Sequence, residues 1–492
     1  MIFAMTSLHL ETGLGLLALL LVLVESFGLM PRRTLAWTAM GGLVLALVLL
    51  PGTASHPVAA SLQPFYTTDG LALFYKGLAI VSTLAVLAMS LEYAPVINNY
   101  ISSKPEQTKE AGLGEFFSLP LVVCVGLMVM ASARDLITIF VSLELTTVSF
   151  YVLVAFMRRS LTSLEAGVKY LILGALSTGL LVYGLAWVYG LTGQTTLAGI
   201  AEKIAIPNWH GSSMPLLFGA ALVLAGLGFK VAAVPFQIWV PDVYQGAPTP
   251  VTAFLSVGSK ASGFIVLTRL VSVLAGENSV IRTPILQTLL ILAGATILVG
   301  NLAAIGQTNF KRLLAYSSIS HAGYLLLALA CVHGHGLDFT PAQVVAFYLA
   351  TYLPMTMVCF LVLSTARAHG MGEDIASLRG FAKQHKLAGL ALTIALASLA
   401  GLPLTAGFIG KFLVFFSVVL DGFDAYPYLA IAVIGAAAGF YYYFKVILAL
   451  YSKGPESPIT VPFSPLSRAL LVLFTVAIIV AGICPGVIRS WL

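Results

Sequence analysis

Lysines occur inside long apolar stretches of this sequence, where little water is present to solvate a charge. Six of them have this setting, and no arginine shares it: Lys76, Lys169, Lys230, Lys260, Lys411 and Lys445. Burial can return a lysine to its neutral form, whereas an arginine stays charged. Buried lysines without buried arginines therefore favour proton exchange over a structural role for fixed charge.

Two ionisable residues lie at the middle of such stretches. Glu144 follows Arg134 by ten residues, and Lys260 follows Pro250 by ten residues. At about 1.5 Å per residue each side chain is roughly 15 Å along a helix, which is the midplane of a hydrocarbon core of about 30 Å. Charges at the midplane are costly and are usually functional. The alternative is a buried ion pair that only holds helices together.

Two further lysines lie beside interruptions of a helix. Lys230 precedes Pro235 by five residues, and Lys411 follows Gly401 and Pro403 in an apolar stretch that is too long for one straight span. Such breaks are tolerated at membrane depth where they line a wet or protein-buried cavity, and with ionisable residues they indicate a transport site. We therefore predict a relay of four proton-carrying residues: Glu144, Lys230, Lys260 and Lys411.

Other ionisable residues are weaker candidates. His321 suits either a proton relay or a hydrogen-bonded packing role. Glu165 precedes Lys169 by four residues, which predicts an ion pair on one helix face. Lys76 and Lys169 lie near expected helix starts, so a functional role and a side chain that reaches to the membrane surface both stay open. Lys445 is expected to reach the surface in this way.

The elements that carry these residues must be surrounded by lipid. The 492 residues are 59% hydrophobic and 9% charged, with a mean hydropathy of +0.99, whereas a soluble protein has about 25% charged residues. The net charge of +6 is not gathered in one arm or stripe, which argues against nucleic acid as a partner. We predict an all-α polytopic membrane protein.

Fourteen apolar segments have about the 20 residues that a transmembrane helix needs. They are expected at 8–30, 35–51, 70–91, 115–132, 134–156, 164–190, 214–235, 248–275, 283–306, 313–331, 341–367, 387–420, 427–450 and 467–489. Most loop cations fall in alternate loops, which is the pattern that the positive-inside rule requires of a correct count. The same rule places both termini on the non-cytoplasmic side.

Motifs for cofactors and metals are absent from the sequence. The four cysteines lie singly without a C-x-x-C pair, which argues against an iron–sulfur cluster or a zinc knuckle. His333 and His335 lack further ligands and predict a loop rather than a metal site. We identify no nicotinamide, flavin or quinone site, and predict no cofactor and no metal on this chain.

Several stretches resemble the antiporter-like membrane subunits of respiratory complex I. They are "SLELTTVSFYVLVAF" around Glu144, "EAGVKYLILGALSTG" from Glu165, "GFKVAAVPFQIWVPDVYQGAPTPV" from Gly228, "KRLLAYSSISHAGYLL" from Lys311 and "LAGLPLTAGFIGKF" ending at Phe412. The "PDVYQGAPTPV" stretch is similar to the N-type subunits, the counterparts of mitochondrial and plastid subunit 2. Lysine at position 411 also fits the N type, since the M type is expected to have glutamate there.

The resemblance implies a single transmembrane domain with an internal repeat. Residues 1–114 would form helices 1–3, residues 115–275 a first five-helix repeat (helices 4–8), residues 283–450 a second, inverted repeat (helices 9–13), and residues 467–489 helix 14. Helices 7 and 12 would be broken. In such subunits the positions of Glu144, Lys230, Lys260 and Lys411 carry protons, with Glu144 stabilising the ammonium of Lys230 and Lys411 leading to the exit.

The resemblance also implies a complex and a membrane to which the chain would belong, and it leaves two alternative functions open. The chain would be a translocase subunit of NADH:quinone oxidoreductase in a bacterial cytoplasmic membrane, with no redox centre of its own. Its partners would be a neighbouring antiporter-like subunit, a small K-type subunit and the lipid bilayer. The alternatives are a subunit of a Mrp-type cation/proton antiporter and a non-conducting scaffold subunit, in which the buried charges would be structural pairs.

Overall fold

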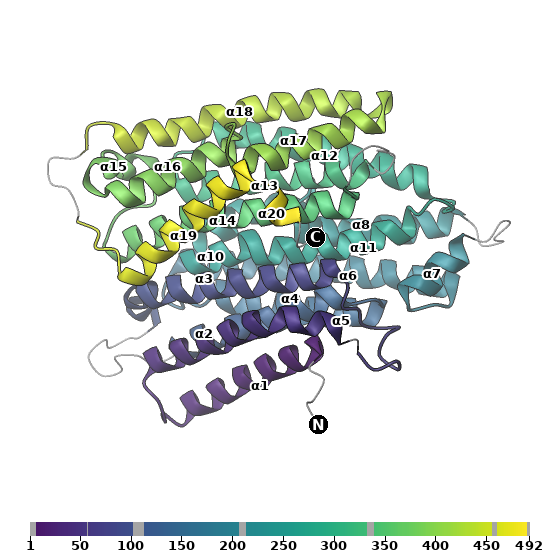
Figure 1. Cartoon of the computed structure of the whole chain (residues 1–492), viewed down its shortest axis with the longest axis horizontal. Coiled ribbons are helices and arrows are strands. Elements are labelled where there is room, and N and C mark those ends of the chain that lie inside the picture. Colours follow the sequence, from purple (N-terminus) through teal and green to yellow (C-terminus); the bar gives the residue numbers. More distant parts are fainter. Residues whose placement is uncertain are drawn as a thin grey trace.

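The computed structural model describes residues 6–56, 58–101, 113–205, 213–331, 339–454 and 460–489. Its helices are α1 (Ser7–Ser26), α2 (Arg32–Leu49), η1 (Leu50–Ser55), α3 (Gly70–Ile101), α4 (Leu113–Ser132), α5 (Leu136–Val154), α6 (Leu161–Thr192), α7 (Leu197–Ile204), α8 (Ser213–Val231), η2 (Phe236–Trp239), α9 (Val240–Gly246), α10 (Thr249–Phe254), η3 (Leu255–Ser259), α11 (Lys260–Leu274), α12 (Arg282–Ile305), α13 (Phe310–Ala330), α14 (Pro341–Ala368), η4 (Ile375–Leu378), α15 (Phe381–Gln384), α16 (Lys386–Ala400), α17 (Ala406–Asp421), η5 (Phe423–Ala425), α18 (Tyr426–Tyr451), α19 (Pro465–Ile483) and α20 (Gly486–Arg489). The long helices run side by side, with α1 and α2 along one edge and α18 along the opposite edge (Figure 1).

The helix count agrees with the predicted fourteen spans. Within the described residues, 13 helical segments are long and apolar enough to cross a membrane. The remaining predicted span, 387–420, is the pair α16 and α17, each of which is too short to cross alone. The chain is therefore an all-α multi-pass membrane protein.

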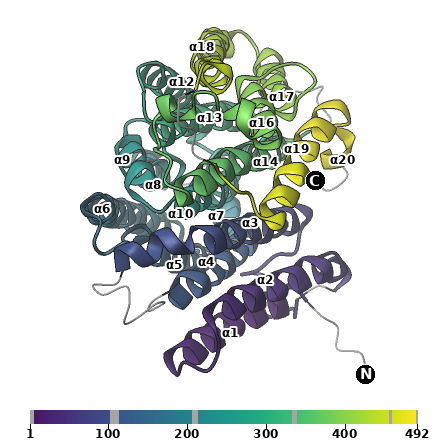
Figure 2. The same cartoon turned by 90° about the vertical axis from the view of Figure 1, so that its left-hand side faces the viewer.

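Three helical spans form the centre of the bundle, and the end-on view in Figure 2 shows other helices around them. The apolar stretches of Thr249–Leu274, Phe310–Ala330 and Pro341–Ala368 are 100%, 94% and 94% buried, whereas those of Ser7–Ser26 and Pro465–Ile483 are 33% buried. The first two central spans have a mean hydropathy of only 1.4, against 2.0 and 2.4 for the two peripheral ones. Polar side chains are tolerated at membrane depth where they face protein rather than lipid.

The predicted boundaries differ most from the structure in two places. Helix α3 continues to Ile101, ten residues past its predicted end, because its polar last turns extend the helix beyond the apolar stretch. The seventh span does not end at Pro235 as predicted. It resumes as η2 and α9 and ends at Gly246, since Trp239, Val240 and Tyr244 are buried in the bundle.

Both predicted helix breaks are present. Helix α8 ends at Val231, and Ala232 has a φ of +64°, which an L-residue rarely adopts. Helix α16 ends with Gly401 at a φ of +97°, where glycine carries no Cβ penalty, and α17 starts at Ala406. A third irregularity was not predicted, namely that the eighth span contains the π-helical turn Leu255–Ser259 immediately before Lys260.

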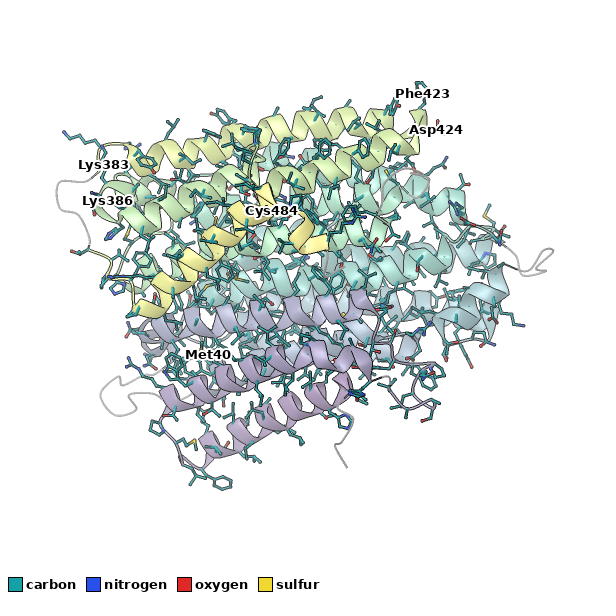
Figure 3. The ribbon with its side chains drawn as sticks, viewed as in Figure 1. Met40, Lys383, Lys386, Phe423, Asp424 and Cys484 are labelled. Atoms are coloured by element: carbon teal, nitrogen blue, oxygen red, sulfur yellow. The ribbon has the colours of Figure 1, made fainter. Side chains whose placement is uncertain are left out.

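The two ends of the bundle differ in charge. Figure 3 shows Lys383 and Lys386 at one end and Phe423 and Asp424 at the other. We call them the α15 end and the α7 end, after the short helices that lie there (Figure 1). The helix ends and short connections at the α15 end carry Arg33, Arg158, Arg159, Arg379, Lys383 and Lys453. Basic residues therefore gather at one end of the bundle, as the alternating loop pattern predicts.

Candidate functional site

Lys230 lies at the end of α8, one residue before the helix break. Its Nζ donates to Thr147 Oγ1 of α5 at 2.6 Å, and the residue is 7% exposed. Helix α11 packs against it closely, because a Cβ on Gly263 would lie 3.4 Å from Lys230 Cβ and 2.9 Å from Val231 Cγ1. The lysine is thus held by a hydroxyl group in a site closed to solvent.

Glu144 precedes Thr147 by one turn on α5. Its Oε1 accepts a hydrogen bond from Thr178 Oγ1 of α6 at 2.8 Å. Among the described residues, the Lys230 ammonium has a hydrogen bond to Thr147 and no contact ion pair with Glu144, which lies on the same helix, α5. A carboxylate near an ammonium group favours the charged form of that group.

A Thr147→Val variant tests this hydroxyl contact. The change keeps the shape of the side chain and leaves the buried ammonium one hydrogen bond short, which costs about 1–3 kcal/mol. We expect the rate of proton transport by the assembled complex in vesicles to fall about tenfold.

The neighbouring Thr146→Val is the matched control. Thr146 Oγ1 donates only to the Ser142 carbonyl oxygen of its own helix, at 2.9 Å. We expect this variant to keep the parent rate. Equal rates in the two valine variants would show that the Thr147 hydroxyl has no part in transport.

Lys260 begins α11, directly after the π-helical turn. Its Nζ donates to Ser318 Oγ of α13 at 2.5 Å and also to the Ser318 carbonyl oxygen, and it lies 5.0 Å from the centre of the Tyr352 ring. The π-helical turn shifts the register of the helix, a feature often found at functional sites. Lys260 therefore projects into the centre of the bundle, against α13.

Helix α13 presents three polar side chains on one face, at three-residue intervals. Ser318 contacts Lys260, and His321 follows one turn later. His321 Nδ1 is 2.6 Å from Tyr348 Oη and its Nε2 is 3.1 Å from Tyr443 Oη. Tyr324 comes after another turn, so the face spans about 9 Å along the helix. Both ring nitrogens of His321 thus have hydroxyl partners, which suits a proton relay.

Lys411 lies on α17, past the second break. Its Nζ donates to the carbonyl oxygens of Leu399 and Ala400, at 2.9 and 2.7 Å, and lies 5.5 Å from the centre of the Tyr324 ring. These carbonyls are the last of α16 and carry the negative end of its dipole. The helix break therefore supplies the partners of this lysine, so that no carboxylate is needed.

The predicted residues fall into two groups. Lys260, His321 and Lys411 are joined by the polar face of α13, while Lys230 and Glu144 are joined by α5. The two groups meet where α11 packs on α8, without a hydrogen bond between Lys230 and Lys260 in the described part of the chain.

Lys169 and Glu165 do not belong to either group. They form the predicted ion pair at 2.7 Å, and Lys169 also binds Asp242 at 2.7 Å, which in turn binds Arg312 at 2.8 Å. The Lys169 side chain is 41% exposed. This cluster lies near the α15 end and, within the described residues, has no hydrogen bond to Lys230, Lys260 or Lys411.

Lys311 lies outside the predicted span 313–331, and that predicted boundary was wrong. It lies in the first turn of α13 and is buried, with Nζ donating to the Ala247 carbonyl oxygen at 2.8 Å and lying 3.5 Å from Glu373. Helix α13 begins three residues before the predicted start at residue 313. The predicted span therefore did not include Lys311. Lys445, by contrast, is partly exposed and donates to the Gln307 carbonyl oxygen, as expected near a helix end.

Glu11 was not singled out by sequence, because the full count of charges within spans covered only the cations. It lies 2.8 Å from Lys76, and both side chains are buried. A count of acidic residues within apolar spans would have found it. The histidines His333 and His335 lie outside the described residues.

The fold and sequence match known membrane proteins. Residues 133–438 match the family model for the membrane domain of NADH:quinone oxidoreductase and Mrp antiporters. The chain is 36% identical to NADH-quinone oxidoreductase subunit N 2 of Chloroherpeton thalassium, covering 96% of this chain and 91% of that one. It is 38% identical to subunit N of Trichlorobacter lovleyi, over 98% and 94% of the two chains.

Solved structures agree with these relatives. A chain of respiratory complex I from Thermus thermophilus, solved with bound aureothin, superposes with a TM-score of 0.79 at 32% identity, covering 98% of both chains. A chain of the Mrp complex from Dietzia sp. gives 0.81 at 19% identity, over 98% of this chain and 95% of that one, which shows the shared fold alone. The chain belongs to the NADH:quinone oxidoreductase/Mrp antiporter membrane family and, within it, to the N subunits of NADH-quinone oxidoreductase.

Proposed function

We propose that this subunit carries protons across the membrane through its buried lysines, driven by quinone reduction elsewhere in the complex. The observation that carries the proposal is the series Lys260, Ser318, His321, Tyr324 and Lys411, in which two buried lysines lie at opposite ends of one polar helix face. Buried ammonium groups held by hydroxyl and carbonyl oxygens, without a contact carboxylate, are poised to exchange their protons.

The relay begins at Lys230. The charge on Glu144 holds Lys230 in the ammonium form, and protonation of Glu144 removes that support. Lys230 then gives up one proton toward Lys260, and Lys260 passes one proton over the Ser318–His321 face of α13 to Lys411. Lys230 takes up a new proton from the uptake side, Lys411 releases its extra proton to the exit side, and Glu144 loses the proton that it gained. Each group then has its starting protonation state, and one proton has crossed. Water between α8 and α11 is required to bridge Lys230 and Lys260.

Proton uptake is proposed at the α15 end. A cavity of about 100 Å³ lies there, and Lys311, Arg367, Glu373 and Tyr100 are among the residues that line it. A cavity of this size has room for several waters. The cations at this end support our proposal that it is the cytoplasmic side, since the positive-inside rule favours basic residues there, and both termini would then be non-cytoplasmic.

The assembly is proposed from the family. The chain would pack in the membrane arm against a neighbouring antiporter-like subunit and a small K-type subunit, with its helices 4–8 and 9–13 forming the inverted repeats. A Mrp-type antiporter is the weaker alternative, since the relatives at 36–38% identity are N subunits and the Mrp neighbour is 19% identical. A scaffold role without transport is the other alternative. Substitution of Lys260 distinguishes it from proton transport.

A Lys260→Met variant tests the proposal. Methionine fills the same space without a charge, so the buried site keeps its packing. We expect the complex to assemble and its proton transport into vesicles, measured as acidification per assembled complex with NADH and quinone, to fall about tenfold or more.

Lys445→Met provides the control at the membrane edge. This lysine is partly exposed and has one carbonyl contact at 3.2 Å. Its loss should leave transport at the parent rate. Parent-level transport by an assembled Lys260→Met complex would refute the relay and favour the scaffold role.

A further inference from the structure

The first and third helices are joined by a fully buried ion pair. Lys76 Nζ of α3 lies 2.8 Å from Glu11 Oε1 of α1, and the two side chains are 0% and 1% exposed. Neither residue lies within residues 133–438, which match the family model. The pair is therefore separate from the four-residue relay and belongs to the N-terminal helices of this chain.

The pair is part of a closed hydrogen-bond cluster. Lys76 Nζ also donates to Tyr66 Oη at 2.6 Å and to Ser7 Oγ at 3.0 Å, and Tyr66 Oη donates to Glu11 Oε1 at 2.8 Å. Burial raises the pKa of the Tyr66 phenol, and the Glu11 carboxylate raises it further, so Tyr66 stays a neutral donor. Ammonium, phenol and carboxylate are thus linked as a continuous path for one proton.

Packing alone does not account for this cluster. A buried ion pair is often no more stabilising than apolar residues of the same size, because both charges lose their hydration. Helices α1 and α3 are surrounded by leucine, alanine and valine side chains that do the packing. Glu11 Oε2 is buried and has no hydrogen-bond partner among the described residues. An acceptor left open in this way is a position for a water or a proton.

Other ionisable groups surround the pair at the α7 end. Asp69 lies before α3 and binds Arg269 of α11 at 3.1 Å, and Arg269 also donates to the Ala131 carbonyl oxygen at 2.8 Å. Cys124 of α4 and Tyr75 of α3 complete the surroundings. Asp69 is half exposed, so the surroundings of the pair reach water at this end of the bundle.

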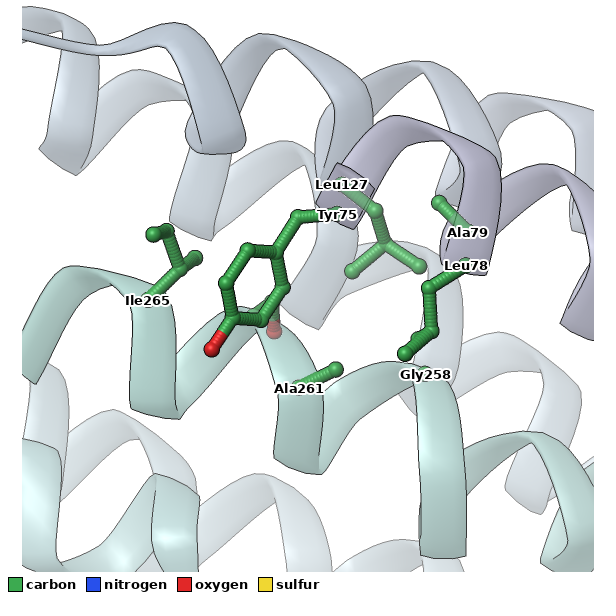
Figure 4. Close-up of a pocket in the computed structure, with 8 residues that line it drawn as sticks. Tyr75, Leu78, Ala79, Leu127, Gly258, Ala261 and Ile265 are labelled. Atoms are coloured by element: carbon green, nitrogen blue, oxygen red, sulfur yellow. The ribbon is translucent and has the colours of Figure 1, made fainter. Parts of the chain in front are cut away.

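A small cavity lies between α3 and α11, beside the helix that carries Lys260. It measures about 10 Å³, and Figure 4 shows the ring of Tyr75 lying in it between Ile265 and Ala261. Tyr75 Oη is buried and has no hydrogen-bond partner in the described part of the chain, and Ser262 supplies a second hydroxyl group. This is room for about one water. The cavity adjoins Tyr75, the neighbour of Lys76, and Ala261, the neighbour of Lys260.

We propose that Glu11 and Lys76 form a second proton-exchange site, which passes protons between the interior of the bundle and water at the α7 end. This inference rests on the proposed proton transport. In one cycle Lys76 gives a proton to Glu11, leaving a neutral amine and a neutral carboxylic acid. Glu11 then releases that proton to water, and the amine takes up one proton from the interior. One proton enters, one leaves, and the ion pair is restored.

The test is a double variant, Glu11→Leu with Lys76→Met, in the assembled complex in vesicles. Replacing both partners by apolar residues avoids an unpaired buried charge, so the complex is expected to assemble. If the pair exchanges protons, acidification per NADH oxidised falls by the same factor as in the Lys260→Met variant. A pair that only joins α1 to α3 would leave this ratio at the parent value, and that result would overturn the inference.

Two further variants keep the result interpretable. The double variant Glu11→Gln with Lys76→Gln keeps hydrogen-bonding groups without charge, and it is used if the apolar double variant does not assemble. We expect the same fall in acidification per NADH oxidised. A parent-level ratio would again overturn the inference. Glu115→Gln with Arg158→Gln removes a surface ion pair of 3.9 Å and should change nothing. If Lys260→Met itself keeps the parent ratio, the proposed transport fails. If only the Glu11–Lys76 variants keep it, this inference alone fails.

Discussion

Replacing Lys230 by arginine is expected to stop proton transport through this subunit although the positive charge is kept. The guanidinium does not release its proton, whereas the amine of a buried lysine does. Thr147 Oγ1 accepts from Lys230 at 2.6 Å and can accept from the arginine in the same way. We expect acidification of vesicles by the assembled complex to fall by about tenfold or more.

The comparison that gives this result its meaning is Lys230→Met. A relay loses transport in both variants, because neither side chain exchanges a proton at this site. A lysine needed only for its charge would be replaced successfully by arginine and not by methionine. Transport at the parent rate in Lys230→Arg would therefore contradict a proton-carrying role. Lys445→Arg, at the edge of the bundle, is the control for a lysine-to-arginine change. We expect it to keep the parent rate of proton transport.

Adding one methyl group at Gly407 is expected to disable Lys411 without touching it. A Cβ at Gly407 would lie 1.9 Å from the Ser398 carbonyl oxygen, so α17 must move away from α16. Lys411 lies one turn further along α17 and takes its partners from the end of α16. A shift of about 1 Å in such an arrangement can cost about a hundredfold in rate. We expect Gly407→Ala to lose proton transport and to lower the unfolding temperature of the purified complex.

Gly306→Ala is the control that separates the displacement of α17 from any general effect of replacing a glycine by alanine. Gly306 ends α12 with nothing within 4 Å of an added Cβ. Its variant should keep both the parent transport rate and the parent unfolding temperature. A Gly407→Ala complex with unchanged transport would show that the contact of Lys411 with the carbonyls of α16 is dispensable.

Much of the fold could be predicted from local pattern. Apolar length determines the spans, because a helix must bury about 20 residues in the hydrocarbon core whatever its neighbours are. Pro235 and Gly401 indicated the two breaks, since their backbone preferences are local. The Glu165–Lys169 pair followed from helix periodicity alone. The π-helical turn before Lys260 was missed, because a one-residue change of register leaves no mark in an apolar stretch.

The chemistry of the buried lysines was decided by tertiary packing. By itself the sequence determined that lysines lie within apolar helical spans, because apolar length is a property of one helix. It did not determine that Lys230 would bind Thr147, that Lys411 would bind the end of α16, or that Glu11 would meet Lys76. These partners are far apart in the chain, and only the packing of whole helices brings their side chains within hydrogen-bonding distance.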